Sequence, residues 1–397
     1  MQMVLSEDSG STRSTLRVLS MVEGTSVTGP IKPLLMFARL ARGGDARPAV
    51  DLSLITTVRS RSSNYPSNLL LDAAKEANIH IDVLLERRAW DTRVLAQLCR
   101  MIELHCPDIV ETHQVKCHFI MAQALLWRKM SKNFAWIAYH HGYTKANLKL
   151  RMYEMLDRWS LKRPDRVVTV CKPFAAELIR HGAPADRVTV ISNAIEPQPR
   201  PTAAQLTELR QRWRLADQSA VILSVGRLSP EKGHSDLIES FRRLRADAAQ
   251  QDLRLLIVGD GPERQRLENA AADLGTSVTF LGHQANVWPF YFVADIFALP
   301  SHSEGSPLVL LEAMAAERAI VATAVGGIPE TVEDDVSAVL VTPRDIVKLQ
   351  EALRSLCGDP ERRIRLAKAA ASALKKFSPE AYRYRVLGLY RETVATP

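Results

Sequence analysis

Features that define several other protein classes are missing from this 397-residue sequence. No apolar run reaches the roughly 18 residues that a membrane-spanning helix needs. Residues 1–15 are rich in Ser and Thr and hold no long apolar core, so we expect a loose tail and not a signal peptide. The five cysteines are odd in number and widely spaced, which favours a reducing cytosol over a disulfide scaffold.

Residue types that bind zinc gather in one stretch, but without the spacing of a zinc knuckle. No C-x-x-C pair occurs there, and residues 94–104 have the periodicity of an amphipathic helix. We therefore predict packing and pocket roles, and no metal, for Cys99, His105, Cys106, His113, Cys117 and His118.

Motifs of other phosphate and hydrolase chemistries are also missing. There is no D-x-D pair, and the nearest run, 333–335, falls in a predicted loop, so a metal-dependent diphosphate site is not indicated. Neither a Walker loop nor G-x-G-x-x-G occurs, which argues against nucleoside triphosphate and dinucleotide binding. No G-x-S-x-G elbow or other nucleophile constellation is present.

The charge is unevenly distributed along the chain. Residues 1–199 carry 27 Lys and Arg against 19 Asp and Glu, whereas the remainder is balanced, so the first half holds the whole net charge of +8. Such asymmetry suits anionic membrane lipid, a lipid-phosphate acceptor or nucleic acid. A basic surface that is merely solvated explains it equally well.

Short apolar runs alternate with helical patterns, which predicts an α/β protein with two Rossmann-like, doubly wound parallel sheets facing across a cleft. The Pro-rich connector 197–202 marks the boundary between two such series. We predict strands at 16–21, 50–55, 79–85, 109–111, 136–139, 166–170, 188–191, 220–225, 253–258, 278–281, 295–299 and 319–323. The predicted parts are a tail (1–15), an N-terminal Rossmann-like domain (16–198), a C-terminal Rossmann-like domain (199–377) and a closing helix (378–397).

Two glutamates stand near a predicted strand-to-helix junction. Glu304 precedes a helix predicted at 308–316, and Glu312 lies in that helix, a little over two helical turns after Glu304. The helix start presents free backbone N–H groups that suit a phosphate, at Gly305, Ser306 and Leu308. Acids on both sides of an anion site suit a ligand with hydroxyl pairs at its ends and a diphosphate between them, which is the layout of a nucleotide-sugar.

A basic loop follows the predicted strand 220–225. Gly226 permits a tight turn, and Arg227 and Lys232 can converge on one anion. Solvated or ion-paired side chains are the common alternative at such positions. Beside the two glutamates, diphosphate binding is the favoured interpretation.

Other loops that follow predicted strands also hold candidate residues. Gly261, in Gly-Asp-Gly-Pro, lets backbone approach a ligand or simply forms a turn. His283 can frame a nucleobase. In the first half, the small-residue loop from Thr25 to Gly29 follows the first strand and is expected to face the same cleft.

Histidines end two strands of the first half. His113 follows one strand, and His140 and His141 follow another. A histidine at such a position can donate to a sugar hydroxyl or phosphate, or act in proton transfer, although a lone one is usually structural. Two such sites on neighbouring strands favour substrate binding.

These segments resemble the retaining glycosyltransferases of family 4, also called glycosyl transferases group 1, which have the GT-B fold. The resemblance rests on E-G-S-P-L-V-L-L-E-A-M-A, V-G-R-L-S-P-E-K-G, G-D-G-P-E and F-L-G-H, and is strong over residues 188–345. It is weaker over 16–187. Residues 377–390 are similar to the family's closing helix, which crosses back to the first domain.

The resemblance implies the roles of the donor-binding residues. Glu304 would bind hydroxyls of the donor sugar, and Glu312 those of the ribose. Arg227 and Lys232 would hold the diphosphate. The segment along sugar and phosphate would be Gly305, Ser306 and Pro307.

The resemblance is less regular elsewhere. His141, which precedes Gly142, is similar to the family histidine near the transferred sugar, but the adjacent His140 could take that place. Residues that depart from the family pattern are Gly29 and Pro30 in the first loop, Cys171, Ala194 and Glu196.

The resemblance implies a metal-independent enzyme without cofactor that moves a sugar from a nucleoside diphosphate to an acceptor hydroxyl with retention. The leaving diphosphate is stabilised electrostatically and helps to deprotonate the acceptor, so no protein nucleophile is needed. We expect a cytoplasmic protein in bacterial surface polysaccharide or glycolipid synthesis, with a carbohydrate or lipid-linked acceptor, peripheral membrane contact and no nucleic-acid partner. The alternatives are a GT-B sugar-phosphate synthase or phosphorylase, and a non-catalytic nucleotide-sugar sensor.

Overall fold

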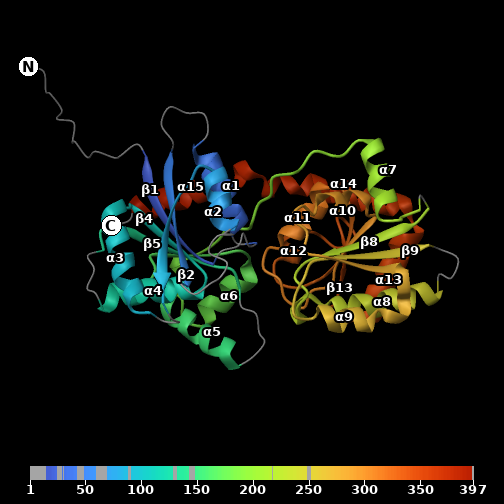
Figure 1. Ribbon diagram of the computed structural model, residues 1–397, viewed down its shortest axis with the longest axis horizontal. Helices are drawn as coiled ribbons and strands as arrows, with labels where there is room; N and C mark the ends of the chain where they lie inside the picture. The colour runs from blue at the N-terminus through green and yellow to red at the C-terminus, as the bar shows by residue number, and fades with distance from the viewer. Residues whose placement is uncertain are drawn as a thin grey trace, which may run out of the picture. The chain divides into compact units, whose positions relative to one another are not determined.

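The computed structural model describes residues 15–24, 29, 31–42, 49–59, 69–87, 91–127, 132–142, 148–216, 218–247 and 252–395. Its strands form two sheets, one of seven strands and one of six (Figure 1). Strand pairs within both sheets are parallel, with helices between successive strands. The predicted class, two Rossmann-like parallel sheets, is confirmed.

The first sheet has the strand order β3-β2-β1-β4-β5-β6-β7. Its strands are β1 (Leu16–Glu23), β2 (Val50–Arg59), β3 (His80–Glu86), β4 (Ile109–His113), β5 (Ala135–His140), β6 (Arg166–Thr169) and β7 (Val188–Val190). The helices between them are α1 (Ile31–Arg42), α2 (Leu69–Glu76), α3 (Arg93–His105), α4 (Val115–Trp127), α5 (Leu148–Ser160) and α6 (Lys172–Arg180).

The second sheet has the strand order β10-β9-β8-β11-β12-β13. Its strands are β8 (Ala220–Val225), β9 (Leu253–Val258), β10 (Val278–Gly282), β11 (Ile296–Leu299), β12 (Ala319–Thr323) and β13 (Val339–Val341). The helices of this part are α7 (Ala203–Arg212), α8 (His234–Asp247), α9 (Arg264–Ala270), α10 (Trp288–Val293), α11 (Leu308–Ala315), α12 (Ile328–Thr331), α13 (Ile346–Gly358) and α14 (Pro360–Ala373). The chain closes with α15 (Pro379–Ala395).

Side chains of the second sheet alternate between two apolar clusters. Val221 and Leu223 of β8 point into one cluster, and Ala220 and Ile222 into the other, as the two-residue period of a strand requires. Helices α10, α11 and α14 lie over one face of the sheet, and α8, α9 and α13 over the other (Figure 1). Both faces are therefore buried, which explains why these strands are continuous apolar runs.

Most strands lie where the sequence predicts them. The strands predicted at 220–225, 253–258 and 319–323 have the predicted bounds. The prediction omitted β13, which is only three residues long. None of the described helices is both long and apolar enough to cross a membrane.

The Pro-rich connector is an extended segment that ends in a helix cap. Residues 191–202 hold neither helix nor strand. The Thr202 hydroxyl accepts the N–H of Gln205, and Oε1 of Gln205 accepts the N–H of Thr202 at 2.8 Å. This reciprocal capping box fixes the start of α7 and ends the connector.

Contacts divide the chain into two compact units. The first comprises Met1–Tyr139, Arg163–Arg166 and Leu387–Pro397. The second comprises His140–Lys162 and Val167–Val386. By strand pairing, β6 and β7 belong to the first sheet, whereas by contacts they group with the second unit.

The C-terminal helix α15 ends in the first unit. One face of this helix, made of Tyr382, Val386, Leu389 and Tyr390, is buried. Within the first unit, the Tyr390 ring packs edge-on against Phe37, and its hydroxyl donates to Oε1 of Glu111 at 2.6 Å. Since Glu111 is fully buried in β4, this hydrogen bond satisfies one oxygen of a carboxyl group that has no access to water.

We predict that Tyr390→Phe lowers the free energy of unfolding by about 2 kcal/mol, because a buried carboxyl group loses a hydrogen-bond donor. Thermal and urea unfolding measure the loss. The matched control is Tyr384→Phe on the same helix, where the side chain is 81% exposed and the change should be within about 0.5 kcal/mol. Equal effects of the two substitutions would show that the Glu111 contact contributes nothing.

Candidate functional site

The strand order of the second sheet reverses between β8 and β11. From β8 the chain continues to β9 and β10 on one side, whereas β11 leads to β12 and β13 on the other. Doubly wound sheets bind ligands at such a switch point, beyond the carboxyl ends of the strands. The loops that leave the sheet here hold Lys232 and Glu304, two residues that the sequence singled out.

An ion pair joins these two loops. Nζ of Lys232 donates to Oε1 of Glu304 at 2.7 Å, and the Ser301 hydroxyl donates to the same oxygen at 2.7 Å. Only 7% of Glu304 is exposed. A carboxylate so far from water needs such partners, because desolvating an unpaired charge is costly. The pair therefore holds the two loops together.

Close backbone packing gives the loop after β8 its shape. Lys232 ends a short 3-10 turn, Pro230–Lys232, and Gly233 follows it with a φ of 67°. A Cβ at Gly233 would lie 2.1 Å from the carbonyl oxygen of Pro300, so only glycine fits here. The N–H of His302 donates to the carbonyl of Glu231 at 2.7 Å, which links the two loops a second time.

Two histidines flank this ion pair. Nε2 of His302 lies 2.7 Å from Oδ2 of Asp236, which fixes the Glu304 loop to the first turn of α8. His234, the first residue of α8, is buried. Burial, and then the charge of Lys232, lower the pKa of His234 to about 4. Its ring is therefore neutral at physiological pH and adds no charge beside Lys232.

Helix α11 begins with unpaired backbone donors. It starts after Pro307, at the predicted position, and no side chain caps it. The N–H groups of Gly305, Ser306 and Leu308 donate to no acceptor within the part of the chain that the structure describes. Nδ2 of Asn193 donates to the carbonyl of Ser306 at 2.7 Å and holds this turn in place. Such a fixed helix start suits an anion.

The glycine-rich turn after β9 packs against the loop after β8. Gly261 leaves no room for a side chain, since a Cβ would lie 2.3 Å from the carbonyl oxygen of Leu228. Gly261 is thus needed for the packing of two loops of the protein, and its predicted approach to a ligand stays a prediction. The Gly261 N–H, helped by Arg264 and His283, lowers the pKa of Asp260. His283 is exposed at the end of β10, beside this carboxylate.

Glu312 is buried on α11, where it contacts a tyrosine. The hydroxyl of Tyr291, on α10, donates to Oε2 of Glu312 at 2.8 Å. Burial, and then the Glu312 charge, raise the pKa of Tyr291 well above its usual value, so the hydroxyl stays protonated and can donate. The tyrosine fixes the orientation of this carboxylate.

Arg227 differs from Lys232 in its surroundings. The side chain is exposed and makes no hydrogen bond or ion pair with any residue that the structure describes. It stands directly after Gly226 at the end of β8. Arg227 thus supplies a positive charge that no carboxylate of the described chain neutralises.

The second unit brings the His140 to Gly142 segment and the Glu304 loop against one aromatic ring. A Cβ at Gly142 would lie 2.3 Å from the Phe174 ring, and a Cβ at Gly305 would lie 2.9 Å from it. His140 is buried, with Nδ1 3.3 Å from Oδ2 of Asp157. His141 is only partly buried, so it is the more accessible of the two histidines.

The first unit has its own switch point, between β1 and β4. His113, which ends β4, is buried, with Nε2 3.1 Å from the Ser20 hydroxyl and its ring stacked on Tyr139 at 4.6 Å. Its predicted role in substrate binding stays a prediction. Gly29 is exposed, and the rest of the loop from Thr25 lies outside the described residues.

A polar cluster at the carboxyl ends of β1 to β3 was not predicted from the sequence. Nζ of Lys116 lies 2.7 Å from Glu86 and 3.7 Å from Glu23, and donates to the Thr57 hydroxyl at 3.3 Å. Glu23 and Glu86 are the last residues of their strands, which was the available signal.

Other contacts of the site were also not predicted. His302 stands two residues before Glu304, so its loop position was a usable signal. No sequence signal pointed to Tyr291, because its helix is short and consists mostly of apolar and aromatic residues.

Two family models match the chain in tandem. The model "Glycosyltransferase Family 4" matches residues 49–199, and "Glycosyl transferases group 1" matches residues 206–373. The chain belongs to this family of glycosyltransferases. The resemblance that the motifs indicated is confirmed.

Curated relatives of this chain are similar over part of their length. D-inositol 3-phosphate glycosyltransferase of Xylanimonas cellulosilytica is 32% identical over 243 residues, 57% of each chain. That of Salinispora tropica is 35% identical, over 58% of this chain and 52% of its own. The α-D-kanosaminyltransferase of Streptomyces kanamyceticus is 34% identical, over 48% of this chain and 50% of its own. The chain thus spans about half the length of the curated relatives it matches.

Solved structures share the fold over nearly the whole chain. HepE of Anabaena, in complex with UDP, has a TM-score of 0.79 at 18% identity and covers 95% of this chain and 100% of its own. A glycosyltransferase of Rickettsia africae has a TM-score of 0.77 at 18% identity, and the match covers 96% of this chain and 100% of its own. The chain has the GT-B fold.

We predict that Gly326→Ala displaces the Glu304 loop. Gly326 has a φ of 54°, and a Cβ would lie 1.6 Å from the carbonyl oxygen of Glu304. Strain of about 1–3 kcal/mol should lower the unfolding midpoint and speed amide hydrogen exchange at residues 303–306. Gly358→Ala, where a Cβ would meet nothing within 4 Å, should change neither quantity. If both variants exchange like the wild type, the packing of this loop tolerates a side chain.

Proposed function

We propose that this protein is a retaining glycosyltransferase that moves a sugar from a nucleoside diphosphate-sugar to an acceptor hydroxyl. The single observation that supports this most is the Lys232–Glu304 ion pair at the switch point of the second sheet. It places an acid suited to sugar hydroxyls beside a cation suited to phosphate. The unpaired N–H groups at the start of α11 lie in the same loop as Glu304.

In the proposed reaction, the site stabilises the leaving diphosphate without a metal. The developing negative charge would be met by Arg227, Lys232 and the N–H groups at the start of α11, which need little reorganisation. Glu304 would accept hydrogen bonds from the transferred sugar, and Glu312 from the ribose. The Tyr291 hydrogen bond leaves Glu312 correctly oriented for that role.

The acceptor hydroxyl would lose its proton to an oxygen of the departing diphosphate, on the same face of the sugar. This sequence of events gives retention with no covalent bond to the protein. The side chains agree with it. Cys171, near the Glu304 loop, has a pKa raised to about 11 by burial, so it is a thiol and a poor nucleophile.

His141 is the histidine that we propose lies beside the transferred sugar. It is the more accessible member of its pair, and Gly142 after it packs on the same ring as Gly305. His140, held by Asp157 in the interior, would position this segment.

A role in building bacterial surface polysaccharide or glycolipid is proposed from the relatives. One is named lipopolysaccharide 1,2-N-acetylglucosaminetransferase, from Salmonella typhimurium, at 28% identity over 59% of this chain and 64% of its own. The donor base and sugar are best identified by thermal-shift screening against UDP-, GDP- and ADP-sugars, because a bound donor raises the unfolding midpoint.

We predict that Glu304→Gln lowers kcat/KM by about 100-fold, because the amide keeps the shape but loses the charge that Lys232 and the sugar hydroxyls need. Release of nucleoside diphosphate from the donor identified by the screen measures it. The matched control is Glu317→Gln, whose side chain is 52% exposed and pairs with Arg200 outside the site.

The same assay separates the remaining alternatives. A non-catalytic sensor would bind the donor with no release of diphosphate by the wild type. A phosphorylase would require inorganic phosphate. Either result, or full activity of Glu304→Gln, would contradict the proposed function.

We also propose peripheral contact with anionic membrane, through an exposed apolar stripe on α5. Met152, Met155 and Trp159 are spaced three and four residues apart, on one side of the helix, and are 47%, 64% and 37% exposed. Lys162 follows them and is exposed. Apolar side chains next to a cation suit the boundary between lipid head groups and acyl chains.

We predict that Met155→Glu reduces binding to vesicles of anionic lipid by about tenfold, because an apolar side chain is replaced by a charge of the same sign as the lipid. Co-sedimentation measures it. The control is Leu104→Glu on α3, another exposed apolar position, where the side chain is 70% exposed. Equal losses for the two variants would mean that membrane contact does not use α5.

A further inference from the structure

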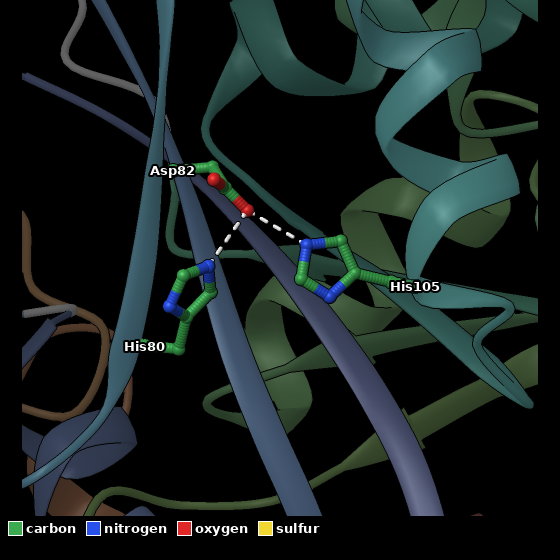
Figure 2. A group of neighbouring side chains, drawn as sticks. All are labelled: His80, Asp82 and His105. Carbon is green, nitrogen blue, oxygen red and sulfur yellow. Dashed lines mark hydrogen bonds and ion pairs between the residues drawn. The ribbon is translucent and has the colours of Figure 1, made fainter.

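Three side chains that can bind metal converge at one edge of the first unit (Figure 2). Nε2 of His80 lies 3.2 Å from Oδ2 of Asp82, and Nε2 of His105 lies 2.7 Å from the same oxygen. The three ligating atoms lie within 4.8 Å of one another. No other group of this kind occurs among the residues that the structure describes.

This group differs from the one that the sequence suggested. Of the six residues considered there, only His105 takes part. His118 instead pairs with Thr112 at 2.7 Å, and the Cys106 thiol donates to the carbonyl of Glu103 at 3.0 Å. His80 and Asp82 were not considered, since they stand 25 and 23 residues before His105.

The group lies at the end of the sheet opposite the strand-end loops. His80 is the first residue of β3, and Asp82 follows on the same face of that strand. His105 is the last residue of α3, four residues before β4 begins. In a parallel sheet, the amino ends of strands share one edge, and ligand loops leave from the other. The group is therefore separate from the polar cluster of Lys116 at the carboxyl ends.

The chemistry of the group is that of a transition-metal site. Figure 2 shows both imidazoles turned toward one carboxylate oxygen, each through Nε2. Without metal, each contact needs a proton on the ring nitrogen. If each ring carries its proton on Nδ1 instead, both Nε2 atoms are free to bind one divalent cation together with the Asp82 carboxylate. Two imidazoles and a carboxylate match zinc, whereas Mg²⁺ and Ca²⁺ prefer oxygen alone.

The distances need little adjustment to accept the ion. In a tetrahedral zinc site with bonds of about 2.0–2.1 Å, ligand atoms stand about 3.3 Å apart. The His80–Asp82 contact of 3.2 Å is close to this value, and the His105–Asp82 contact of 2.7 Å would have to lengthen by about 0.6 Å. His80 is 61% exposed and can rotate, whereas Asp82 and His105 are 25% and 18% exposed and are held by their strand and helix.

We propose that His80, Asp82 and His105 bind one divalent transition-metal ion, with zinc the best match, and that this ion fastens the edge strand β3 to the end of α3. Water completes the coordination. The edge strand gains a crosslink to a helix that packs on the same sheet, so the ion stabilises the first unit. The site is independent of the proposed transferase chemistry.

The test uses the full-length protein, stripped with a chelator and titrated with zinc chloride by calorimetry. We expect one zinc per chain, a rise of several degrees in the unfolding midpoint, and no competition from excess Mg²⁺ or Ca²⁺. Asp82→Asn and His105→Gln should each weaken binding by about 100-fold. The matched control, His181→Ala, removes a partly buried histidine that directly follows α6 and whose Nδ1 contacts the carbonyl of Glu177. It should bind zinc like the wild type.

Two outcomes would overturn the proposal: no zinc binding by the wild type, or equal binding by wild type, Asp82→Asn and His105→Gln. Because those two variants could disturb folding, His80→Ala serves as a further variant. Its position is exposed, so it should keep the wild-type unfolding midpoint in chelator while losing the rise that zinc causes. If it keeps that rise, zinc binds elsewhere.

Discussion

Burying a carboxylate without a counter-charge is costly, and Glu304 is a carboxylate that the second unit buries. Lys232 supplies the charge, from a loop 72 residues earlier in the chain. Each loop therefore depends on the other for its position. An ammonium group has three N–H donors, and only one contacts Glu304 in the described chain. The remaining donors let Lys232 hold the loops together and still face an anion.

The rest of the site follows from this constraint. For Lys232 to reach Glu304, the turn at Gly233 must pass against the backbone of Pro300, which excludes any larger residue. Once the loop after β11 is fixed, the first N–H groups of α11 are fixed with it. Asn193 adds two hydrogen bonds to Ser306, which precedes this helix. A site assembled in this way needs little rearrangement when charge develops on a ligand, which is the main electrostatic requirement of transfer chemistry.

The sequence predicts the strands and the loop positions well, but not which side chains meet. Strands such as 220–225 are unbroken apolar runs bounded by turn residues, so their ends are visible. β13 is too short for any period to appear.

Lys232 was predicted to bind an anion directly, and the sequence gives no sign that it also pairs with Glu304. The hydrogen bond from Tyr291 to Glu312 joins α10 and α11, whose side chains are mostly apolar. No local sequence pattern predicts this contact. His113 illustrates the same limit, because a strand end fixes its place but not its burial.

The charge surplus of the first half has a further physical consequence. Lys116, the cation at the carboxyl ends of β1 to β3, is already opposed by Glu86 and Glu23. A region with both signs of charge and a hydroxyl at Thr57 suits a ligand that donates and accepts hydrogen bonds, such as a sugar, better than a dense polyanion. The excess positive charge of the first half is therefore not concentrated in this cluster. Under the proposed function, a basic surface would attract a negatively charged lipid surface at long range, whereas recognition of an acceptor would depend on short hydrogen bonds at the strand ends.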